Sequence, residues 1–243
     1  MLRLTRHGIR EMMIGSIVLG AIALGLAYVW LPLAVLVLPV WIWLFAFFRD
    51  PERPVPTEPR IMVSPADGTV SDVTPLSHVQ LLGEPAVRIG IFLSVFDVHI
   101  NRAPCDGRVT TIKYQPGRFI NALHHQQASE QNECNTLVLC DVADGQPLAM
   151  VKQIVGAIAR RIVCTASVGD LLQRGQRIGM MKFGSRTELF IPTRLNPEVK
   201  VAVGQKVRGA LDVIAVLHSP APTTATPTAE SACGQPALPK ELK

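Results

Sequence analysis

The chain has 243 residues, which is enough for one or two domains, and it carries a formal net charge of +5. Its basic residues are scattered along the sequence, so the composition does not indicate a nucleic-acid-binding protein. The five cysteines are odd in number and no two are separated by two residues, so the sequence predicts neither a disulfide framework nor a metal site.

The N-terminal part of the chain is apolar enough to enter a membrane. Residues 12–48 contain no Asp, Glu, Lys or Arg. A bilayer core needs about 20 apolar residues per helix, so this run can hold two short helices. Proline disfavours helix at the residue before it, and the Pro32 region is therefore the expected break. We predict a transmembrane helical hairpin formed by Met12–Val29 and Pro32–Phe48.

Positive charge flanks the apolar run on both sides, which predicts that both ends lie in the cytoplasm and that the number of spans is even. The flanking residues are Arg3, Arg6, His7 and Arg10 before the run, and Arg49 and Arg53 after it. The expected location is the cell membrane, with the rest of the chain in the cytoplasm. Each helix is somewhat short, so a hairpin that enters only one leaflet is an alternative.

The remainder of the chain divides into three parts by composition. Residues 49–59 are rich in proline and charge, which is typical of an extended linker. Residues 60–218 hold short β-branched stretches separated by turn residues, which predicts a mainly β, β-sandwich-like domain. Glycines and valines in 168–179 and 203–209 are spaced as in the hairpins of carrier domains. Residues 219–243 lack core-forming side chains, so a disordered tail is expected.

Asp67 and His99 are the first candidates for chemistry. Asp67 precedes a glycine in Ser64–Gly68, where an aspartate is most often a turn residue. His99 follows Asp97 by two residues, and alternate side chains of a strand share a face. A histidine beside a carboxylate is suited to general-base work near neutral pH, whereas a lone histidine on a strand is more often structural.

Lys182 supports a different hypothesis. Biotinyl and lipoyl carrier domains present an acceptor lysine at a hairpin tip, often next to methionine, and Lys182 follows Met180 and Met181. The glycine spacing noted above fits such a fold. An ordinary surface lysine is the simpler interpretation.

Ser185 follows Gly184 in a strand-like stretch of the last quarter of the chain. Such a pair is usually an ordinary turn. Its chemical interest is that a serine hydroxyl can attack the carbonyl of the preceding residue and convert the amide to an ester. Glycine at that position leaves the carbonyl unshielded and permits unusual backbone dihedrals. Elimination and hydrolysis would then leave a pyruvoyl group, whose ketone can form a Schiff base with a substrate amine and withdraw electrons as pyridoxal phosphate does.

Several motifs occur in an order and spacing that resemble the short-form, pyruvoyl-dependent phosphatidylserine decarboxylases, over residues 45–218. They are Phe48–Arg53, Ser64–Gly68, Asp97–Pro104, Ser129–Glu133, Gln153–Ile162 and Phe183–Arg186. The apolar N-terminal segment fits an enzyme that acts on a membrane lipid. One position departs from the longer members of the family, because Arg102 stands where those members carry a second histidine.

The resemblance implies that the chain cleaves itself between Gly184 and Ser185. Residues 1–184 would form a large chain, and Ser185 would become a covalent pyruvoyl group at the head of a small chain, 185–243. Asp67 and a histidine are implied to help activate Ser185. Because Arg102 replaces the second histidine, the family's division of labour cannot be carried over, and our hypothesis is that His99 assists decarboxylation and also serves maturation with Asp67. The product would be phosphatidylethanolamine, without metal or diffusible cofactor. The sequence leaves the oligomeric state open, a homo-oligomer included. The alternatives are a membrane-tethered carrier domain modified at Lys182 and a non-catalytic membrane adaptor.

Overall fold

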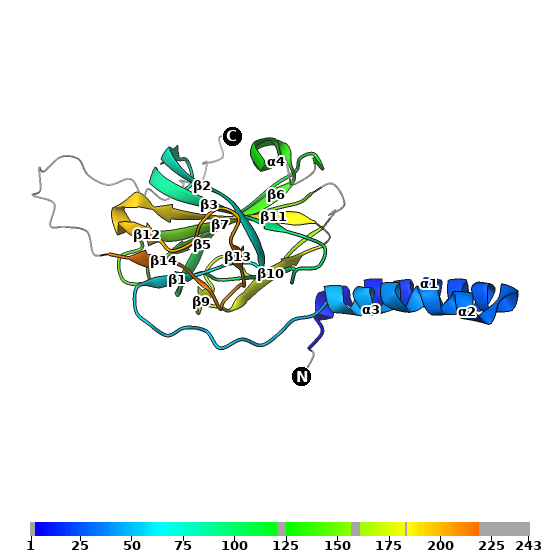
Figure 1. The fold of residues 1–243 in the computed structure, drawn as a ribbon. Helices are drawn as coiled ribbons and strands as arrows, with labels where there is room; N and C mark the ends of the chain where they lie inside the picture. Colours follow the sequence, from blue (N-terminus) through cyan, green and yellow to red (C-terminus); the bar gives the residue numbers. More distant parts are fainter. Residues whose placement is uncertain (1–2, 121–124, 157–160, 183, 219–243) are drawn as a thin grey trace, which may run out of the picture.

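The structure is a computed structural model that describes residues 3–120, 125–156, 161–182 and 184–218. An apolar helical hairpin projects from one end of a β domain, and the described chain begins at the junction of the two parts (Figure 1). The predicted tail, 219–243, lies outside the described residues, as does Phe183.

Helices are concentrated in the hairpin. They are the short 3-10 helix η1 (Arg6–Gly8), α1 (Ile9–Val29), α2 (Leu31–Ala34), η2 (Val35–Val37) and α3 (Leu38–Phe47), with α4 (His125–Gln131) and η3 (Thr193–Leu195) in the β domain. The expected hairpin is therefore present, but its second segment is not one continuous helix. Pro39 lies in the first turn of α3, and a proline inside a helix removes a backbone donor, so the segment is interrupted at η2.

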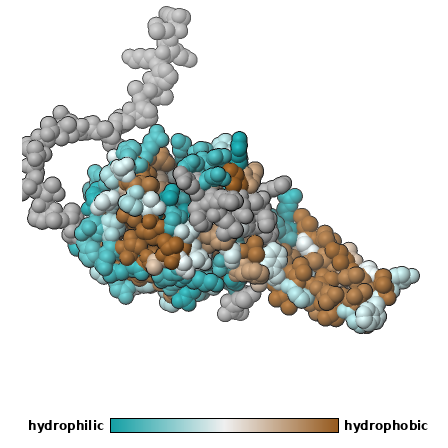
Figure 2. All heavy atoms as spheres, turned by 45° about the horizontal axis from the view of Figure 1, so that its top comes forward, coloured by the Kyte–Doolittle hydropathy of each residue, from teal (hydrophilic) through white to brown (hydrophobic). Residues whose placement is uncertain are grey.

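The hairpin exposes the apolar side chains that a membrane would cover. Figure 2 shows a hydrophobic surface along its projecting part, and Leu24, Val29 and Leu31 are each more than 70% exposed. Among the described residues, one helix, Arg6–Val29, is long and apolar enough to cross a membrane, while Leu31–Phe47 is shorter. The long apolar helix is consistent with membrane association.

The β domain contains fourteen strands among the described residues. They are β1 (Ile61–Val63), β2 (Gly68–Val79), β3 (Glu84–Leu93), β4 (Ile100–Arg102), β5 (Gly107–Gln115), β6 (Cys134–Cys140), β7 (Pro147–Ile154), β8 (Ile162–Cys164), β9 (Leu171–Leu172), β10 (Arg177–Met181), β11 (Ser185–Pro192), β12 (Pro197–Val199), β13 (Lys206–Val207) and β14 (Val213–Leu217). The prediction of a mainly β fold is confirmed.

Eight strands form one curled antiparallel sheet in the order β13-β2-β3-β11-β7-β6-β5-β9 (Figure 1). Two three-stranded sheets, β1-β14-β12 and β4-β10-β8, complete the domain. The main core contains side chains from all three sheets, such as Leu189 from β11, Ala215 from β14 and Ile178 from β10. The alternation of apolar residues along the strands thus gives a sandwich-like packing.

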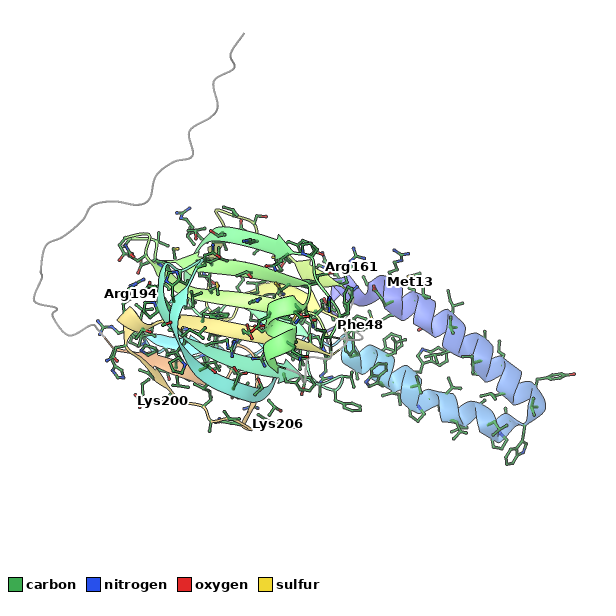
Figure 3. The ribbon with its side chains drawn as sticks, turned by 90° about the horizontal axis from the view of Figure 1, so that it is seen from above. Met13, Phe48, Arg161, Arg194, Lys200 and Lys206 are labelled. Atoms are coloured by element: carbon green, nitrogen blue, oxygen red, sulfur yellow. The ribbon has the colours of Figure 1, made fainter. Side chains whose placement is uncertain are left out.

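The hairpin is packed onto the β domain at its base. Phe47 and Phe48 are both buried, and they form a second apolar cluster with Met12, Ile100 and Met180. Figure 3 shows Phe48 at the point where the hairpin meets the domain. The cluster joins α1 and α3 to strands β4 and β10, so the apolar segment is part of the folded protein and not only a tether.

Leu189 tests the packing of the central strand. We expect Leu189→Ala to lower the free energy of unfolding by about 2–5 kcal/mol, because the buried side chain leaves a cavity in the main core. Urea denaturation of the protein in detergent measures the change. The control Val203→Ala removes a side chain that is 62% exposed and should change stability by less than about 0.5 kcal/mol. Equal effects of the two substitutions would contradict this packing.

Candidate active site

Ser185 is the first residue of β11, which lies between β3 and β7 in the middle of the large sheet. Every residue of this strand is buried. The Ser185 hydroxyl is fully buried, and it has no hydrogen-bond partner within the described part of the chain. An unsatisfied buried hydroxyl costs about 1–3 kcal/mol, which makes it a candidate for a chemical role.

Gly184 brings the chain into β11 with a left-handed backbone conformation, with φ of +55°. Apart from its two chain neighbours, no described atom lies within 4 Å of a Cβ built at this position. The position therefore favours glycine because of its backbone dihedral and not because of crowding. The space beside Gly184 agrees with an accessible carbonyl ahead of the serine.

The expected strand through Asp97 and His99 is wrong, because the chain turns at residues 95–96 and His99 directly precedes β4. Strand β3 ends at Leu93 and β4 begins at Ile100. The carboxylate of Asp97 accepts hydrogen bonds from the main-chain N (2.8 Å) and the Oγ (2.7 Å) of Ser94. A side chain that caps its own turn competes with strand formation, which is why the alternation failed here. The Asp97 carboxylate therefore stabilises the turn and is not paired with the histidine ring.

The imidazole of His99 is held by its Nδ1 atom, which lies 3.0 Å from the main-chain oxygen of Asp97. That contact requires a proton on Nδ1, so Nε2 carries the free lone pair. Nε2 is buried and has no partner among the described residues. The ring lies against Phe47 of α3, with ring centroids 4.4 Å apart. Burial lowers the pKa of His99 to about 4, so the ring is neutral at neutral pH.

His99 also contacts the segment that leads to Ser185. The main-chain N of Met181 donates to the His99 carbonyl oxygen over 3.1 Å. Residue 181 ends β10, four residues before the serine. The structure thus places His99, Gly184 and Ser185 in one region at the base of the hairpin.

Asp67 is buried, and it is already engaged. Arg53 donates to both of its carboxylate oxygens, over 2.6 and 2.7 Å, and the main-chain N of Gly209 donates over 2.8 Å. Since the Ser185 hydroxyl and His99 Nε2 have no partner in the described residues, Asp67 bonds to neither atom. The contact with Arg53 instead fastens the proline-rich segment after the hairpin to the domain.

Lys182 does not lie at an exposed hairpin tip. Its side chain is 7% exposed, and Nζ lies 2.5 Å from Oε1 of Glu11 in α1. An acceptor for biotin or lipoate must project into solvent, so this position does not fit the carrier-domain hypothesis. Arg102, at the place of the second histidine, is also structural here, because it donates to Asp50 and to the Pro51 and Gly175 carbonyls.

A buried ionic cluster that sequence reasoning missed lies directly after Ser185. The Arg186 side chain is fully buried and donates to Glu188 over 2.9 Å, to Ser71 over 2.5 Å and to Asp72. Arg88 also contacts Asp72 over 3.1 Å. Two charged residues at alternate positions of the strand, followed by an apolar run, were the available signal for this cluster. The ionic cluster ties the head of β11 to β2 and β3.

A second buried network runs along the opposite face of β11. The Asn101 side chain donates to the Thr187 hydroxyl (2.9 Å), Gln153 donates to Asn101 (2.9 Å), and Asn135 donates to Gln153 (3.0 Å). Thr187 shares its face of the strand with Ser185. These amides satisfy one another in the core, so the backbone beside the serine is fixed on both faces of the sheet.

Comparison with known proteins agrees with this architecture. The fold and the site define a mainly β protein with a buried Gly-Ser junction at the base of an apolar hairpin. A family model described as phosphatidylserine decarboxylase matches residues 41–215. The chain therefore belongs to the phosphatidylserine decarboxylase family.

Individual relatives give the same result. A protein of Cupriavidus metallidurans is 42% identical over 183 residues, which are 74% of this chain and 82% of the relative. One from Cereibacter sphaeroides is 42% identical over 205 residues, 83% of this chain and 86% of the relative. One from Syntrophus aciditrophicus is 46% identical over 174 residues, 71% of this chain and 79% of the relative. All three bear the name phosphatidylserine decarboxylase proenzyme.

The lowered pKa of His99 predicts a pH dependence of stability. Between the ordinary value of 6.5 and the folded value of about 4, the unfolded chain binds a proton that the folded chain does not. Stability is therefore lost as the pH falls through this window, by about 2 kcal/mol between pH 7 and pH 5. Urea denaturation of chains that carry Ser185→Ala, so that every sample is one polypeptide, measures the loss.

In the same background, His99→Phe should remove this part of the pH dependence, whereas His78→Gln, at an exposed histidine, should retain it. If the free energy of unfolding depends on pH in the same way with and without His99, the lowered pKa of His99 is not its cause.

The buried ionic cluster predicts a large cost for removing one partner. We expect Arg186→Met in the Ser185→Ala background to lower the free energy of unfolding by about 3–5 kcal/mol, because the buried Glu188 would keep only a 4.0 Å contact with Arg88 and the Ser129 hydroxyl as partners. Adding Glu188→Gln should restore part of the loss. The control Arg208→Met breaks a pair in which the arginine is 63% exposed, and should cost less than about 1 kcal/mol. Similar losses for Arg186 and Arg208 would show that the cluster is not desolvated.

Proposed function

We propose that this protein decarboxylates phosphatidylserine to phosphatidylethanolamine, with a pyruvoyl group that it makes from Ser185 by cleaving its own chain after Gly184. The observation that carries the proposal is the buried Ser185 hydroxyl, which has no hydrogen-bond partner among the described residues and follows a glycine in a left-handed conformation. Membership of the family supports the reaction, and the word proenzyme in the names of the relatives supports maturation by cleavage.

Maturation begins with Ser185 itself. Its Oγ attacks the Gly184 carbonyl carbon, the bond to the Ser185 nitrogen breaks, and the amide becomes an ester. Loss of the Ser185 α-proton then expels the Gly184 carboxylate, which ends the large chain 1–184 and leaves dehydroalanine at the head of 185–243. Water converts this residue to the pyruvoyl ketone and releases ammonia. Within the described part of the chain, the space beside the Gly184 Cα and the lack of a competing partner for the hydroxyl support the first step.

His99 is the proposed base. Its Nε2 lone pair has no partner among the described residues and its lowered pKa keeps the ring neutral, so it can accept the hydroxyl proton at neutral pH. We assign it the same proton-handling role during decarboxylation. Asp67 acts through charge in this proposal. Its carboxylate is among the groups that favour the protonated form of His99, so it stabilises the cation that forms transiently.

The pyruvoyl ketone supplies an electron sink for the electrons left by the departing carboxylate. Buried apolar residues of the chain exclude water from the site. The ionic cluster at Arg186 and the amide network at Thr187 hold residue 185 in place. The site lies where Phe47 of the hairpin touches His99, which supports a substrate that comes from the membrane.

The proposed function assigns a role to each of the four segments of the chain. Residues 1–48 anchor the protein in the cell membrane, 49–59 form the linker, 60–218 form the decarboxylase domain in the cytoplasm, and 219–243 form a tail. Positive charge on both sides of the apolar run supports the cytoplasmic side.

Intact mass under denaturing conditions tests the function first. We expect two chains, 1–184 and 185–243, the smaller about 17 Da lighter than a serine-headed peptide because ammonia has been lost. The purified protein should convert phosphatidylserine in vesicles to phosphatidylethanolamine with release of carbon dioxide. Ser185→Ala should stay in one piece and form no product, and His99→Ala should slow product formation by about 100-fold or more.

The matched control is Ser167→Ala, which alters an exposed serine and should mature normally. An uncleaved, unmodified wild-type chain that still forms phosphatidylethanolamine would refute the pyruvoyl mechanism. A single chain heavier than its sequence would direct attention to Lys182.

A further inference from the structure

One acidic residue stands among the first 49 residues of the chain, and it contacts the segment that precedes the proposed cleavage bond. Glu11 lies in the first turn of α1, next to a long apolar run. Its Oε1 lies 2.5 Å from Nζ of Lys182, which is two residues before Gly184. The anchor helix and the cleavage segment are therefore joined by a direct ion pair.

The pair is largely removed from water. The side chains are 7% exposed for Lys182 and 31% exposed for Glu11, and Oε2 of Glu11 is buried without a partner in the described residues. A buried ammonium group needs a counter-ion, because desolvation of an isolated charge is costly. Displacement of α1 from the domain would leave the lysine without one, so the position of residue 182 depends on the position of the helix.

The backbone around Lys182 is held from two other directions. Its main-chain N donates to the Arg161 carbonyl over 3.3 Å, and the preceding Met181 N donates to the His99 carbonyl over 3.1 Å. Figure 3 shows Arg161 beside the start of α1. The ion pair thus completes a set of contacts that fixes the chain immediately before Gly184.

The other contacts between hairpin and domain are either apolar or lie away from the cleavage segment. Hydrogen bonds from Trp43 to the Val95 carbonyl and from Arg49 to the Phe96 carbonyl join the second half of the hairpin to the turn before His99. The cluster around Phe47, Phe48 and Met180 is apolar, and apolar contacts are non-directional. Such a cluster tolerates sliding of the hairpin, whereas an ion pair with one fixed partner specifies one register. The Glu11–Lys182 pair is the directional contact between the anchor and the cleavage segment.

We propose that the Glu11–Lys182 pair makes self-cleavage after Gly184 depend on docking of the anchor helix against the β domain. Both are positioning residues, since neither touches the Ser185 hydroxyl. With the helix docked, the pair restricts Lys182, two residues before Gly184, and so helps to keep the Gly184 carbonyl in place for attack. Without it, the segment samples other conformations and the attack becomes rarer. This inference rests on the proposed function, because it concerns the maturation step of that function.

The rate of self-cleavage tests the proposal. The full chain is synthesised in a cell-free system with lipid nanodiscs, and conversion of one chain to two is followed on denaturing gels. Lys182→Met and Glu11→Gln should each slow conversion by about tenfold or more, which corresponds to ~1.4 kcal/mol of activation free energy. The exchanged variant Glu11→Lys with Lys182→Glu should recover to within about threefold of wild type. The control Lys200→Met, which breaks an exposed pair with Glu198, should convert at the wild-type rate.

The outcomes separate this inference from the proposed function. A wild-type chain that never cleaves would overturn the function itself. Single variants that cleave at the wild-type rate would overturn the positioning role while leaving the function intact. Slow cleavage without recovery in the exchanged variant would also overturn it, because the defect would then follow from folding. Resistance of the β domain to trypsin, compared in all variants, shows whether folding is retained.

Discussion

The placement of β11 in the middle of the large sheet is the constraint on which the rest of the structure depends. The strand forms backbone ladders with β3 on one side and β7 on the other, and all of its residues are buried. A central strand retains two sets of hydrogen bonds even if its covalent link to the preceding residue is broken. Ser185 can therefore stand at the head of a new chain without loss of its position, and the ionic cluster at Arg186 adds a side-chain attachment that is independent of the ladder.

Burial has opposite consequences for neighbouring groups of this site. Arg186 and Glu188 are charged and fully buried, so each must be paired. Ser185 and His99 are equally buried, yet one polar atom of each has no partner in the described residues. The fold thus satisfies the charges that hold the strand and leaves unsatisfied the two atoms that the proposed chemistry needs. Burial also keeps His99 neutral, which is the state in which Nε2 can accept a proton.

The hairpin contacts the candidate site and also carries the apolar surface that is consistent with membrane association. Its base contributes Phe47, which touches the His99 ring, and Glu11, which pairs with Lys182. A lipid in the bilayer would therefore reach the site along the same element that shapes it. In the proposed function, the hairpin would bring the domain to its substrate and would also restrict the conformation of the catalytic region.

The sequence by itself determined the elements whose signals are local. The absence of charge over residues 12–48 predicted the apolar hairpin, the β-branched stretches predicted a mainly β domain, and the Gly-Ser pair marked the candidate junction. Only the tertiary structure decided the contacts between distant segments, because burial and partner choice depend on residues far apart in the chain. It moved the Asp97 carboxylate into a turn, paired Lys182 with Glu11, engaged Asp67 with Arg53, and assembled the ionic cluster behind Ser185. The periodicity of the sequence predicts which face of a strand a side chain occupies. Its hydrogen-bond or ion-pair partner on that face is determined by the folding of the whole chain.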